Sequence, residues 1–523
     1  MPTLRSQLTH LPIPLQFGTS GRRGLIADLT QLEIYINVTA ELEYLQSLRP
    51  EDGGIVRGDE FFYARDLRPS SPALCEAVEQ AIADAGMRAV NLGQIPTPAL
   101  MNYGVGKRRA SIMVTGSHIP FDRNGYKLNT SRGELLKEHE APIGAKVCEV
   151  RERVYSQDST DSPFDSTGTL RAHRPLTPAI DASRDAHVAR YLDFFSGQTK
   201  GLAGRRILVY QHSAVGRDLL TDLLARLGAH IISAGRSDNF VPIDTENIDA
   251  TQLDTIQKLA DQHEDLWAVV STDGDSDRPL ILAVDPDGRV KFFGGDLVGM
   301  IVAEYLHADA VVVPISCNDA IDLGSLAAVL EPKTRIGSPF VIAGMVTAIA
   351  KGRHAVCGWE ANGGFLLGSD IERNGHQLTA LPTRDAFLPV LSVLFAAAER
   401  DTGIAELFAD LPKRFSKAGL LKDFPRETSV RIVQRLSQPG AGADLSRVLT
   451  VARGFTSVTR LDYTDGVRIV FSNHDVAHIR PSGNADELRI YATADTQARA
   501  DAIVAEGIRE PDGILRSLQR LLA

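Results

Sequence analysis

The sequence predicts an α/β protein made of three similar α/β domains, followed by a separate C-terminal α+β domain. Three times along the chain, a segment with apolar residues at helical spacing adjoins a short β-branched run that ends in a polar, glycine-rich turn. Apolar runs that alternate with helical segments in this way are typical of βαβ units and mostly parallel sheets. The length of 523 residues supports the division, because it exceeds what one hydrophobic core can organise.

The three repeats can be followed in the sequence. The first contains PALCEAVEQAIADAGMRAVNLG, with Leu74, Val78, Ile82 and Ala85 at helical spacing, and leads to ASIMVTGSH. The second runs from GRRILVYQHS through DLLTDLLARLGAHIISAG to LWAVVSTDGDSD. The third runs from DLVGMIVAEYLHADAVVVPIS to HAVCGWEANGG. Each repeat therefore ends in a polar loop that directly follows a predicted strand.

A different pattern begins near Thr456. There SVTRLDYTDGVRIVFSN predicts two alternating strands joined by a turn at Asp465 and Gly466, and a closing helix is expected from about Thr496. These elements predict an antiparallel α+β domain. Ahead of the second repeat, residues 155–178 are rich in Ser, Asp, Thr and Pro, which predicts a mobile surface insertion within the first domain.

Composition narrows the class of protein. The net charge of −10 argues against a general nucleic-acid binder, which needs a basic face. The four cysteines show neither the density of a disulfide framework nor the spacing of a zinc site. No apolar stretch reaches the length of a membrane span, and the N-terminal segment lacks the pattern of a signal peptide. We therefore expect a cytoplasmic protein without a nucleic-acid or membrane partner.

Polar loops after strands are candidate sites, because open α/β sheets bind ligands beyond the carboxyl ends of their strands. The first such loop, VTGSHIPFDRNGYKLN, places Ser117 between Gly116 and His118, where its hydroxyl is a candidate nucleophile. The alternative for Ser117 and His118 is a turn that satisfies backbone groups, and the local pattern alone favours it. Lys127 follows in a turn that folds back toward the serine, with a solvated surface lysine as the alternative.

The second loop, STDGDSDRP, is more specific. Asp273, Asp275 and Asp277 alternate within it, and Gly274 permits a tight turn. Close carboxylates repel one another and are tolerated when a cation neutralises them, and oxygen ligands favour Mg²⁺ over zinc. An EF-hand is the alternative, but its D-x-D-x-D-G spacing and its glutamate at the twelfth position are missing. The loop therefore predicts a magnesium site.

Two further loops complete the set. GWEANGGF offers Glu360 and Asn362, a carboxylate and an amide suited to sugar hydroxyls, although such a turn is usually structural. RPSGNADELR predicts an anion site, with a solvated turn as the alternative. The groups that would converge on the anion are Arg480, Ser482, the NH groups around Gly483, and Arg489. A hydroxyl nucleophile, a metal loop, a sugar loop and a phosphate clamp together suit phosphoryl transfer on a sugar.

These motifs resemble those of the α-D-phosphohexomutase superfamily, which includes phosphoglucomutase, phosphomannomutase and phosphoglucosamine mutases. FGTSGRRG is similar to the opening loop of the family, TGSHIP to its phosphoserine loop and DGDSDRP to its metal loop. GWEANGGF and RPSGNADELR resemble the sugar and phosphate loops. The motifs occur in family order from Gly18 to Arg489, so the resemblance covers essentially the whole chain.

The resemblance implies three α/β domains with mixed sheets and a rotating C-terminal α+β domain around a central cleft. The implied division is a phosphoserine domain at 1–195, a metal-binding domain at 196–305, a sugar-binding domain at 306–425 and a phosphate-binding domain at 426–523. It also implies a phosphoserine at Ser117, whose phosphate holds Mg²⁺ together with Asp273, Asp275 and Asp277.

Further roles follow from the resemblance alone. It implies that Arg23 and Arg278 support the transferring phosphate, and that His118 and Lys127 transfer protons. It implies that Glu360 and Asn362 hold sugar hydroxyls. The residues implied for the phosphate that does not react are Arg480, Ser482, Gly483, Asn484 and Arg489.

The implied activity is the interconversion of hexose 1-phosphate and hexose 6-phosphate, of mannose or glucose, with hexose 1,6-bisphosphate as activator and intermediate. A mutase for glucosamine or N-acetylglucosamine phosphate is the alternative within the family. A metal-dependent phosphatase would need the aspartate loop but no second phosphate clamp. A sugar-phosphate sensor without catalysis would need neither Ser117 nor Lys127.

Overall fold

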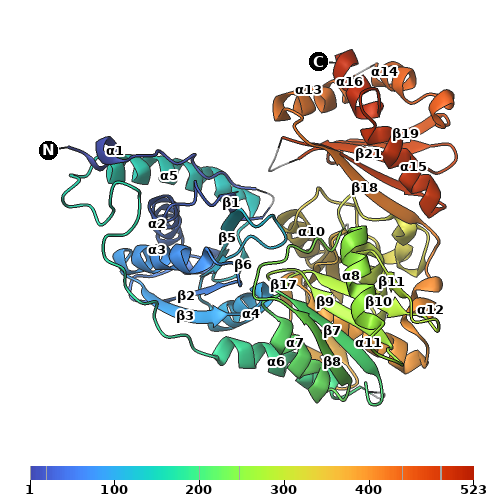
Figure 1. Cartoon of the computed structure of the whole chain (residues 1–523), viewed down its shortest axis with the longest axis horizontal. Coiled ribbons are helices and arrows are strands. Elements are labelled where there is room, and N and C mark those ends of the chain that lie inside the picture. The colour runs from blue at the N-terminus through green and yellow to red at the C-terminus, as the bar shows by residue number, and fades with distance from the viewer. Residues whose placement is uncertain are drawn as a thin grey trace.

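The computed structural model describes residues 2–18, 20–198, 201–246, 248–438, 440–482 and 486–522. Within them the chain forms four main sheets in four successive units. Figure 1 shows the first unit at the left in blue, the second and third together at the lower right in green to orange, and the C-terminal unit above them in red. None of the described helices has the length and apolar character needed to cross a bilayer.

The first unit contains a mixed sheet with the order β1-β5-β4-β2-β3, and β6 pairs with β5. Its strands are β1 (Arg22–Leu25), β2 (Glu60–Arg65), β3 (Arg88–Gln94), β4 (Ser111–Val114), β5 (Arg123–Thr130) and β6 (Gly133–Glu134). β2 runs parallel to β3 and β4, whereas β5 runs antiparallel to β4 and β1. The predicted helix with Leu74, Val78 and Ile82 is α3, and all three side chains are buried.

The second and third units repeat this arrangement. The second sheet has the order β11-β10-β9-β7-β8 and contains β7 (Arg206–His212), β8 (His230–Arg236), β9 (Ala268–Thr272), β10 (Pro279–Val284) and β11 (Val290–Phe292). The third has the order β12-β13-β14-β17 and contains β12 (Ala310–Val312), β13 (Val356–Trp359), β14 (Phe365–Leu367) and β17 (Leu381–Asp385). A separate hairpin is formed by β15 (Ile371–Arg373) and β16 (His376–Leu378). One hydrophobic core joins these two units.

The same topological step carries a candidate loop in each of the three mixed sheets. The serine loop joins β4 to β5, the aspartate loop joins β9 to β10, and the sugar loop joins β13 to β14. In every case the first strand has a parallel neighbour and the second strand turns back antiparallel to the first. All residues of β4, β9 and β13 are buried, as expected for strands covered on both faces. The three predicted repeats are therefore confirmed at the level of topology.

The helices cover these sheets and form the links between them. In the first unit they are α1 (Leu4–Gln7), α2 (Gln31–Ser47), α3 (Ser71–Asp84), α4 (Thr97–Lys107) and α5 (Glu140–Tyr155). Later helices are α6 (Ala182–Phe195), α7 (Arg217–Arg226), α8 (Ala250–Ala260), α9 (Gly295–Tyr305), α10 (Ser338–Ala350), α11 (Phe387–Arg400) and α12 (Ile404–Ala409). Short 3₁₀ turns occur at Pro50–Asp52, Lys137–His139, Asp319–Asp322, Ser325–Val329 and Val451–Arg453.

The C-terminal unit is an antiparallel sheet with the order β18-β22-β21-β20-β19. Its elements are β18 (Phe415–Leu421), α13 (Arg426–Leu436), α14 (Ala441–Val448), β19 (Val458–Asp462), β20 (Val467–Phe471), β21 (Val476–Pro481), β22 (Leu488–Ala494), α15 (Gln497–Ile508) and α16 (Ile514–Leu522). Gly466 has a φ of 74° in the predicted turn, and the Thr496 hydroxyl caps the predicted closing helix, α15. β18 lies inside the range predicted for the third domain but belongs to this sheet, and the four domain ranges stay predictions.

The expected mobile insertion at residues 155–178 is wrong for its middle part. Phe164 and Leu170 form an isolated bridge, and both side chains are buried in the core of the first unit. The ring of Phe164 packs against Tyr35 of α2 at 5.2 Å between centroids. The Leu170 amide donates a hydrogen bond to the Gln31 side chain at 2.8 Å. These contacts anchor the polar segment although its composition resembles that of a loop.

Candidate active site

The candidate nucleophile Ser117 lies in the loop of residues 115–122. Its amide donates a hydrogen bond to the Thr115 hydroxyl at 2.8 Å. Its φ of 51° falls in the left-handed region, where a residue other than glycine stays only if its surroundings hold it. The side chain is fully buried, and its hydroxyl donates a hydrogen bond to Asp273 Oδ2 at 2.5 Å. The serine loop and the aspartate loop therefore meet at the serine itself.

Arg68 holds the serine loop in this shape. The guanidinium donates hydrogen bonds of 2.5–3.0 Å to the carbonyl oxygens of Ser117, Ile119, Pro120 and Arg123. The ring of Phe240, from the second unit, covers this guanidinium at 3.8 Å. Asp66, which follows β2, accepts a hydrogen bond from the Thr115 hydroxyl at 2.8 Å. The loop thus has a rigid support of buried, paired groups.

The three aspartates of the second loop gather at one point. Asp273, Asp275 and Asp277 are buried, and each offers a carboxylate oxygen within 4.8 Å of the others. Asp275 Oδ1 and Asp277 Oδ1 accept no hydrogen bond from the described residues. A buried carboxylate oxygen without a donor is costly unless a cation contacts it. This donor set fits a hard divalent cation, as the sequence predicted.

Electrostatics within the triad point the same way. Burial, and then the carboxylates of Asp275 and Asp277, raise the pKa of Asp273 well above its usual value. Burial also opposes the charge on Asp277, but Arg384 and Lys127 outweigh it and hold the pKa of Asp277 below its usual value. A cation beside Asp273 would offset the repulsion and restore its charge.

Lys127 connects the first unit to the aspartate loop. It lies in β5 with 7% of its surface exposed, and Nζ donates to Asp275 Oδ2 at 2.8 Å and to Asp277 Oδ2 at 2.6 Å. The hydroxyl of Thr97, the first residue of α4, donates to Asp275 Oδ2 at 2.6 Å. The alternative of a solvated surface lysine is therefore wrong, because the ammonium is buried between two carboxylates.

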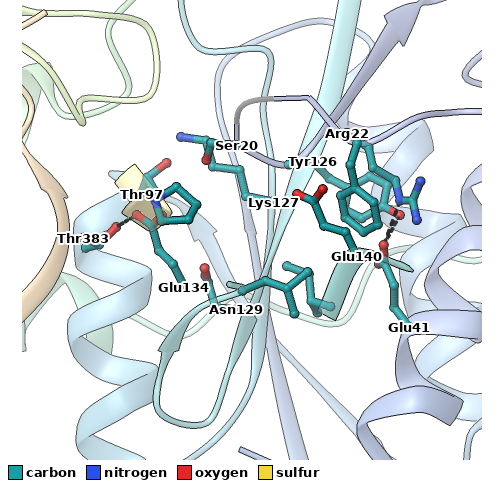
Figure 2. Close-up of a pocket in the computed structure, with 15 residues that line it drawn as sticks. Ser20, Arg22, Glu41, Thr97, Tyr126, Lys127, Asn129, Glu134, Glu140 and Thr383 are labelled. Carbon is teal, nitrogen blue, oxygen red and sulfur yellow. Dashed lines mark hydrogen bonds and ion pairs between the residues drawn. The ribbon is translucent and has the colours of Figure 1, made fainter. Parts of the chain in front are cut away.

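A small cavity of about 20 Å³ lies beside Lys127, and Figure 2 shows its lining. On one side, Thr383 of the third unit donates a hydrogen bond to Glu134. On the other side, Arg22 pairs with Glu41 at 2.9 Å. A space of this size holds about one water molecule, so it is not the substrate site. Its contacts instead join the first unit to the third.

Basic groups surround the point where the two loops meet. Arg23 in β1 is half-buried, and burial, together with Arg278 and Arg384, lowers its pKa to about 10, so it stays cationic at neutral pH. Burial, and then Arg278 and Arg23, hold the pKa of His118 well below its usual value. His118 Nδ1 lies 3.3 Å from Ser117 Oγ. A phosphoryl group would therefore meet a cationic environment and a neutral imidazole here.

The sugar loop is linked to the aspartate triad through Arg384 of β17. Glu360 and Asn362 lie between β13 and β14, and both are buried. Arg384 donates from NH1 to Glu360 Oε2 at 3.0 Å and from Nε to Asp277 Oδ2 at 3.2 Å. Asn362 Oδ1 accepts a hydrogen bond from the Gly364 amide at 2.9 Å and so supports the turn of its own loop. Glu360 is therefore part of the connected site, whereas the Asn362 side chain supports its own loop and the Asn362 carbonyl accepts a hydrogen bond from the Thr245 hydroxyl of the second unit at 2.8 Å.

The predicted phosphate clamp lies on the C-terminal unit. Arg480 is in β21, Ser482 directly follows that strand, and Arg489 is in β22. Gly483 and Asn484 lie outside the described residues. Among the described residues, no hydrogen bond or ion pair joins Arg480 or Arg489 to the aspartate triad. The two arginines of the clamp and the triad are thus not directly bonded to each other in the described part of the chain.

The turn between β19 and β20 connects the C-terminal unit to the third unit. Asp465 in this turn accepts a hydrogen bond from the Ile336 amide at 3.0 Å. The other oxygen of the same carboxylate, Oδ1, lies 3.5 Å from Arg480 Nε. Arg480 is therefore held next to the contact between the two units.

A larger cavity of about 580 Å³ lies where the second, third and C-terminal units meet. Its lining includes Glu246, Ala361 and Tyr491, and its volume is in the range of small-molecule sites. Burial raises the pKa of Glu246 to about 7, although Arg278 and Arg489 oppose this shift. Glu246 thus lies within electrostatic reach of basic residues from two units.

Sequence reasoning missed four residues that the structure brings to the site. Asp66 and Arg68 could have been found from the sequence, because the residues DLRPS directly follow the apolar strand β2. Thr97 stands between two prolines at the start of α4, which is a helix-start signal. Arg384 lies inside a strand, and its local sequence carries no signal of a site.

Three mixed-sheet α/β units that bring a buried serine, an aspartate triad and several arginines together define a multidomain enzyme of the phosphoryl-transfer class. The chain matches the models of phosphoglucomutase/phosphomannomutase α/β/α domain I at residues 14–153, of α/β/α domain III at 294–415 and of the C-terminal domain at 431–509. The chain belongs to the phosphoglucomutase/phosphomannomutase family, as the sequence motifs predicted.

Individual relatives agree with this assignment. The chain is 38% identical to a phosphomannomutase from Salmonella muenchen, with 94% of each chain covered. It is 37% identical to a phosphomannomutase from Sinorhizobium fredii, covering 94% of this chain and 98% of that one. A solved structure of a phosphoglucomutase/phosphomannomutase family protein from Burkholderia thailandensis has the same fold, with a TM-score of 0.67, 18% identity and coverage of 99% and 98%. The protein is a hexose phosphate mutase, an isomerase.

Proposed function

We propose that the enzyme interconverts the 1-phosphate and the 6-phosphate of mannose or glucose through a phosphoserine at Ser117. The observation that carries this proposal is the hydrogen bond from Ser117 Oγ to Asp273, which brings the hydroxyl against the aspartate triad. The phosphoserine passes its phosphoryl group to the free hydroxyl of the substrate and forms a hexose 1,6-bisphosphate. The bisphosphate then reorients in the site and transfers its other phosphoryl group to Ser117. The phosphoserine is thereby regenerated, so no co-substrate is consumed.

Asp273, Asp275 and Asp277, with the phosphate on Ser117, are the groups proposed to hold Mg²⁺. When bound, Mg²⁺ supplies positive charge that offsets the negative charge of the transferring phosphoryl group. Two features support this assignment: Asp275 Oδ1 and Asp277 Oδ1 accept no hydrogen bond from the described residues, and the pKa of Asp273 is raised. Both are explained by a cation that belongs to the working enzyme.

Proton transfer is assigned to His118 and Lys127. The substrate hydroxyl must lose a proton when it accepts the phosphoryl group. The Ser117 oxygen must gain a proton when it gives the phosphoryl group up. His118 is neutral because its pKa is low, and its Nδ1 lies 3.3 Å from Ser117 Oγ, so it suits the role of acceptor. The Lys127 ammonium, beside Asp275, suits the role of donor or of stabilising the serine alkoxide.

The remaining predicted residues are assigned to recognition. Arg23 and Arg278 would contact the transferring phosphoryl group. This assignment is supported because the charges of Arg278, Asp275 and Asp277 all act on the Arg23 guanidinium. Glu360 and Asn362 would hold sugar hydroxyls. The phosphate that does not react would be held by Arg480, Ser482, Gly483, Asn484 and Arg489. Both substrate orientations would present a phosphate to this clamp, because the reacting end changes between the two transfers.

The four cysteines support a cytoplasmic location. Cys75, Cys317 and Cys357 are buried, Cys148 is exposed, and none is paired. Unpaired cysteines are typical of proteins in reducing compartments.

Among the candidate substrates we favour mannose phosphate, because the relatives at 37–38% identity are named phosphomannomutase. Relatives named phosphoglucosamine mutase match at 23–28% identity. We expect kcat/KM for mannose 1-phosphate to exceed that for glucosamine 1-phosphate by about 10-fold or more. Coupled assays on the 1-phosphates of mannose, glucose and glucosamine measure this ratio. A preference for the aminosugar would replace the proposal, and release of inorganic phosphate without isomerisation would indicate a phosphatase.

Replacing Arg480 with alanine should raise KM for both the hexose 1-phosphate and the hexose 6-phosphate, by roughly 10- to 100-fold. The planar guanidinium can grip a phosphate on either end of the sugar, so both directions should suffer alike. Steady-state kinetics in both directions measure the effect. Arg460→Ala is the matched control, because Arg460 is an exposed arginine of the same sheet. An increase of KM in one direction alone would contradict a shared anchor.

A further inference from the structure

Arg384 joins two loops that belong to different units. It lies in β17 with 3% of its surface exposed. Its Nε and NH2 atoms lie 3.2 and 3.0 Å from Asp277 Oδ2, and NH1 donates to Glu360 Oε2 at 3.0 Å. One planar guanidinium therefore holds a carboxylate of the aspartate loop and a carboxylate of the sugar loop at the same time.

Gly364 leaves the space that this arginine occupies. A Cβ atom on Gly364 would lie 2.6 Å from Arg384 Cδ and 2.7 Å from Cγ, which is closer than real Cβ contacts. The atoms that it would meet belong to the stem of the side chain rather than to its flexible end. A larger residue at this position would therefore displace the guanidinium from both carboxylates. Because Gly364 and Glu360 share one loop, the loop and the arginine form a matched pair.

Glu360 depends on this contact for its direction. Its side chain is buried, and a buried carboxylate is held in place by the donors that it meets, of which the Arg384 guanidinium is one. Arg384 engages only Oε2. Among the hydrogen bonds of the described residues, none reaches Glu360 Oε1. One oxygen is thus fixed by the arginine, and the other keeps its capacity to accept a hydrogen bond.

We propose that Arg384 is a positioning residue for sugar recognition, which orients Glu360 so that Oε1 accepts a hydrogen bond from a hydroxyl of the hexose ring. The proposal rests on the mutase function proposed above, since it concerns the same site. Arg384 acts through Glu360 and makes no contact with the sugar in this role. Its contact with Asp277 anchors the guanidinium and keeps the sugar loop in register with the aspartate loop.

Kinetics of two Arg384 variants test the proposal. Arg384→Met removes the oriented contact and should raise KM for the hexose 1-phosphate roughly 10- to 100-fold, with a smaller change in kcat. Arg384→Lys keeps the positive charge, but a single ammonium group cannot contact both carboxylates as the planar guanidinium does. The KM of this variant should therefore lie between those of the wild type and Arg384→Met. Arg373→Met is the matched control, because Arg373 pairs with Glu399 at 2.6 Å within the third unit but touches no residue assigned to the site. It should leave KM unchanged.

A double-mutant cycle separates positioning from general destabilisation. Glu360→Gln, Arg384→Met and the double variant are compared on the hexose 1-phosphate and on its monodeoxy analogues. If Arg384 acts through Glu360, KM of the double variant should stay within about twofold of that of Glu360→Gln. Both single variants should also lose discrimination against the same analogue, which lacks the hydroxyl that Glu360 contacts. In the double variant residue 360 is a neutral glutamine, so the loss of Arg384 leaves no buried, unpaired carboxylate there. The double variant can therefore be tested even if Arg384→Met folds poorly.

Two results would overturn the proposal: additive effects on KM in the cycle, or unchanged discrimination among the analogues in a folded Arg384→Met enzyme. A wild-type enzyme that isomerises none of the three sugar phosphates would overturn the mutase function instead. The two failures are therefore distinguishable.

Discussion

Replacing Ser117 with alanine is expected to abolish isomerisation, with a fall in turnover of about 10⁴-fold or more. The hydroxyl is the atom that would carry the phosphoryl group, and it is buried against Asp273. A coupled assay measures turnover, and intact-mass spectrometry of freshly purified enzyme measures the covalent phosphate. The phosphate adduct should be present in part of the wild-type protein and absent from Ser117→Ala.

A second buried serine provides the control for this experiment. Ser392 lies in α11, its hydroxyl is buried, and it makes no hydrogen bond with the described residues. Ser392→Ala should therefore retain full turnover and the same phosphate adduct. An active Ser117→Ala enzyme with normal turnover would disprove the phosphoserine relay.

Replacing Asp275 with alanine is expected to lower kcat by about 10²- to 10³-fold while KM changes little. The variant loses one carboxylate of the triad and the partner of both Lys127 and Thr97. The remaining carboxylates would hold a divalent cation poorly, and the charge of the transferring group would be less well offset. Activity as a function of Mg²⁺ concentration measures the effect, together with the shift of Tm that Mg²⁺ causes in the wild type and should not cause in the variant.

The turn at residues 285–289 provides the comparison for the aspartate loop. Asp287 is exposed in this second Asp-rich turn, so Asp287→Asn should leave both the rate and the Mg²⁺-induced shift of Tm unchanged. Treatment with EDTA should abolish wild-type activity, and added Mg²⁺ should restore it. Full activity after EDTA treatment would show that the aspartate loop is not a metal site.

Much of the site could be predicted because its residues follow strands. Ser117 follows β4, Asp273 follows β9 and Glu360 follows β13, so the apolar runs alone indicate where each polar loop begins. The alternation of Asp273, Asp275 and Asp277 adds a chemical signal, since close carboxylates require a neutralising cation. The structure brings these loops together as predicted.

Residues that act from inside an element or from a distant loop were harder to find. Arg384 lies 107 positions after Asp277, which it contacts, and it sits in a short strand like any other strand residue. Thr97 reaches Asp275 across 178 positions. No local pattern encodes such pairs, because they depend on how the first, second and third units pack against one another.

The segment at residues 155–178 shows the same limit in the opposite direction. Its polar composition predicted a mobile insertion, and yet Phe164 and Leu170 are buried against α2. Two apolar side chains are enough to anchor a polar segment when a neighbouring core has space for them. The average composition of a segment does not reveal single buried residues such as Phe164 and Leu170, so the prediction from composition was wrong for this part of the chain.

Sequence alone was sufficient for the α/β class, the three repeats, the separate C-terminal sheet and the family, and it indicated the loops that form the candidate site. These features depend on short-range periodicity and on residues that leave a strand at its carboxyl end. Three-dimensional packing was needed to show that Lys127 is buried between Asp275 and Asp277, and that Arg384 ties the sugar loop to the aspartate loop. The reason is physical: these residues become buried and form ion pairs only when separate units pack against one another. Local sequence patterns do not encode which surfaces will meet in this way.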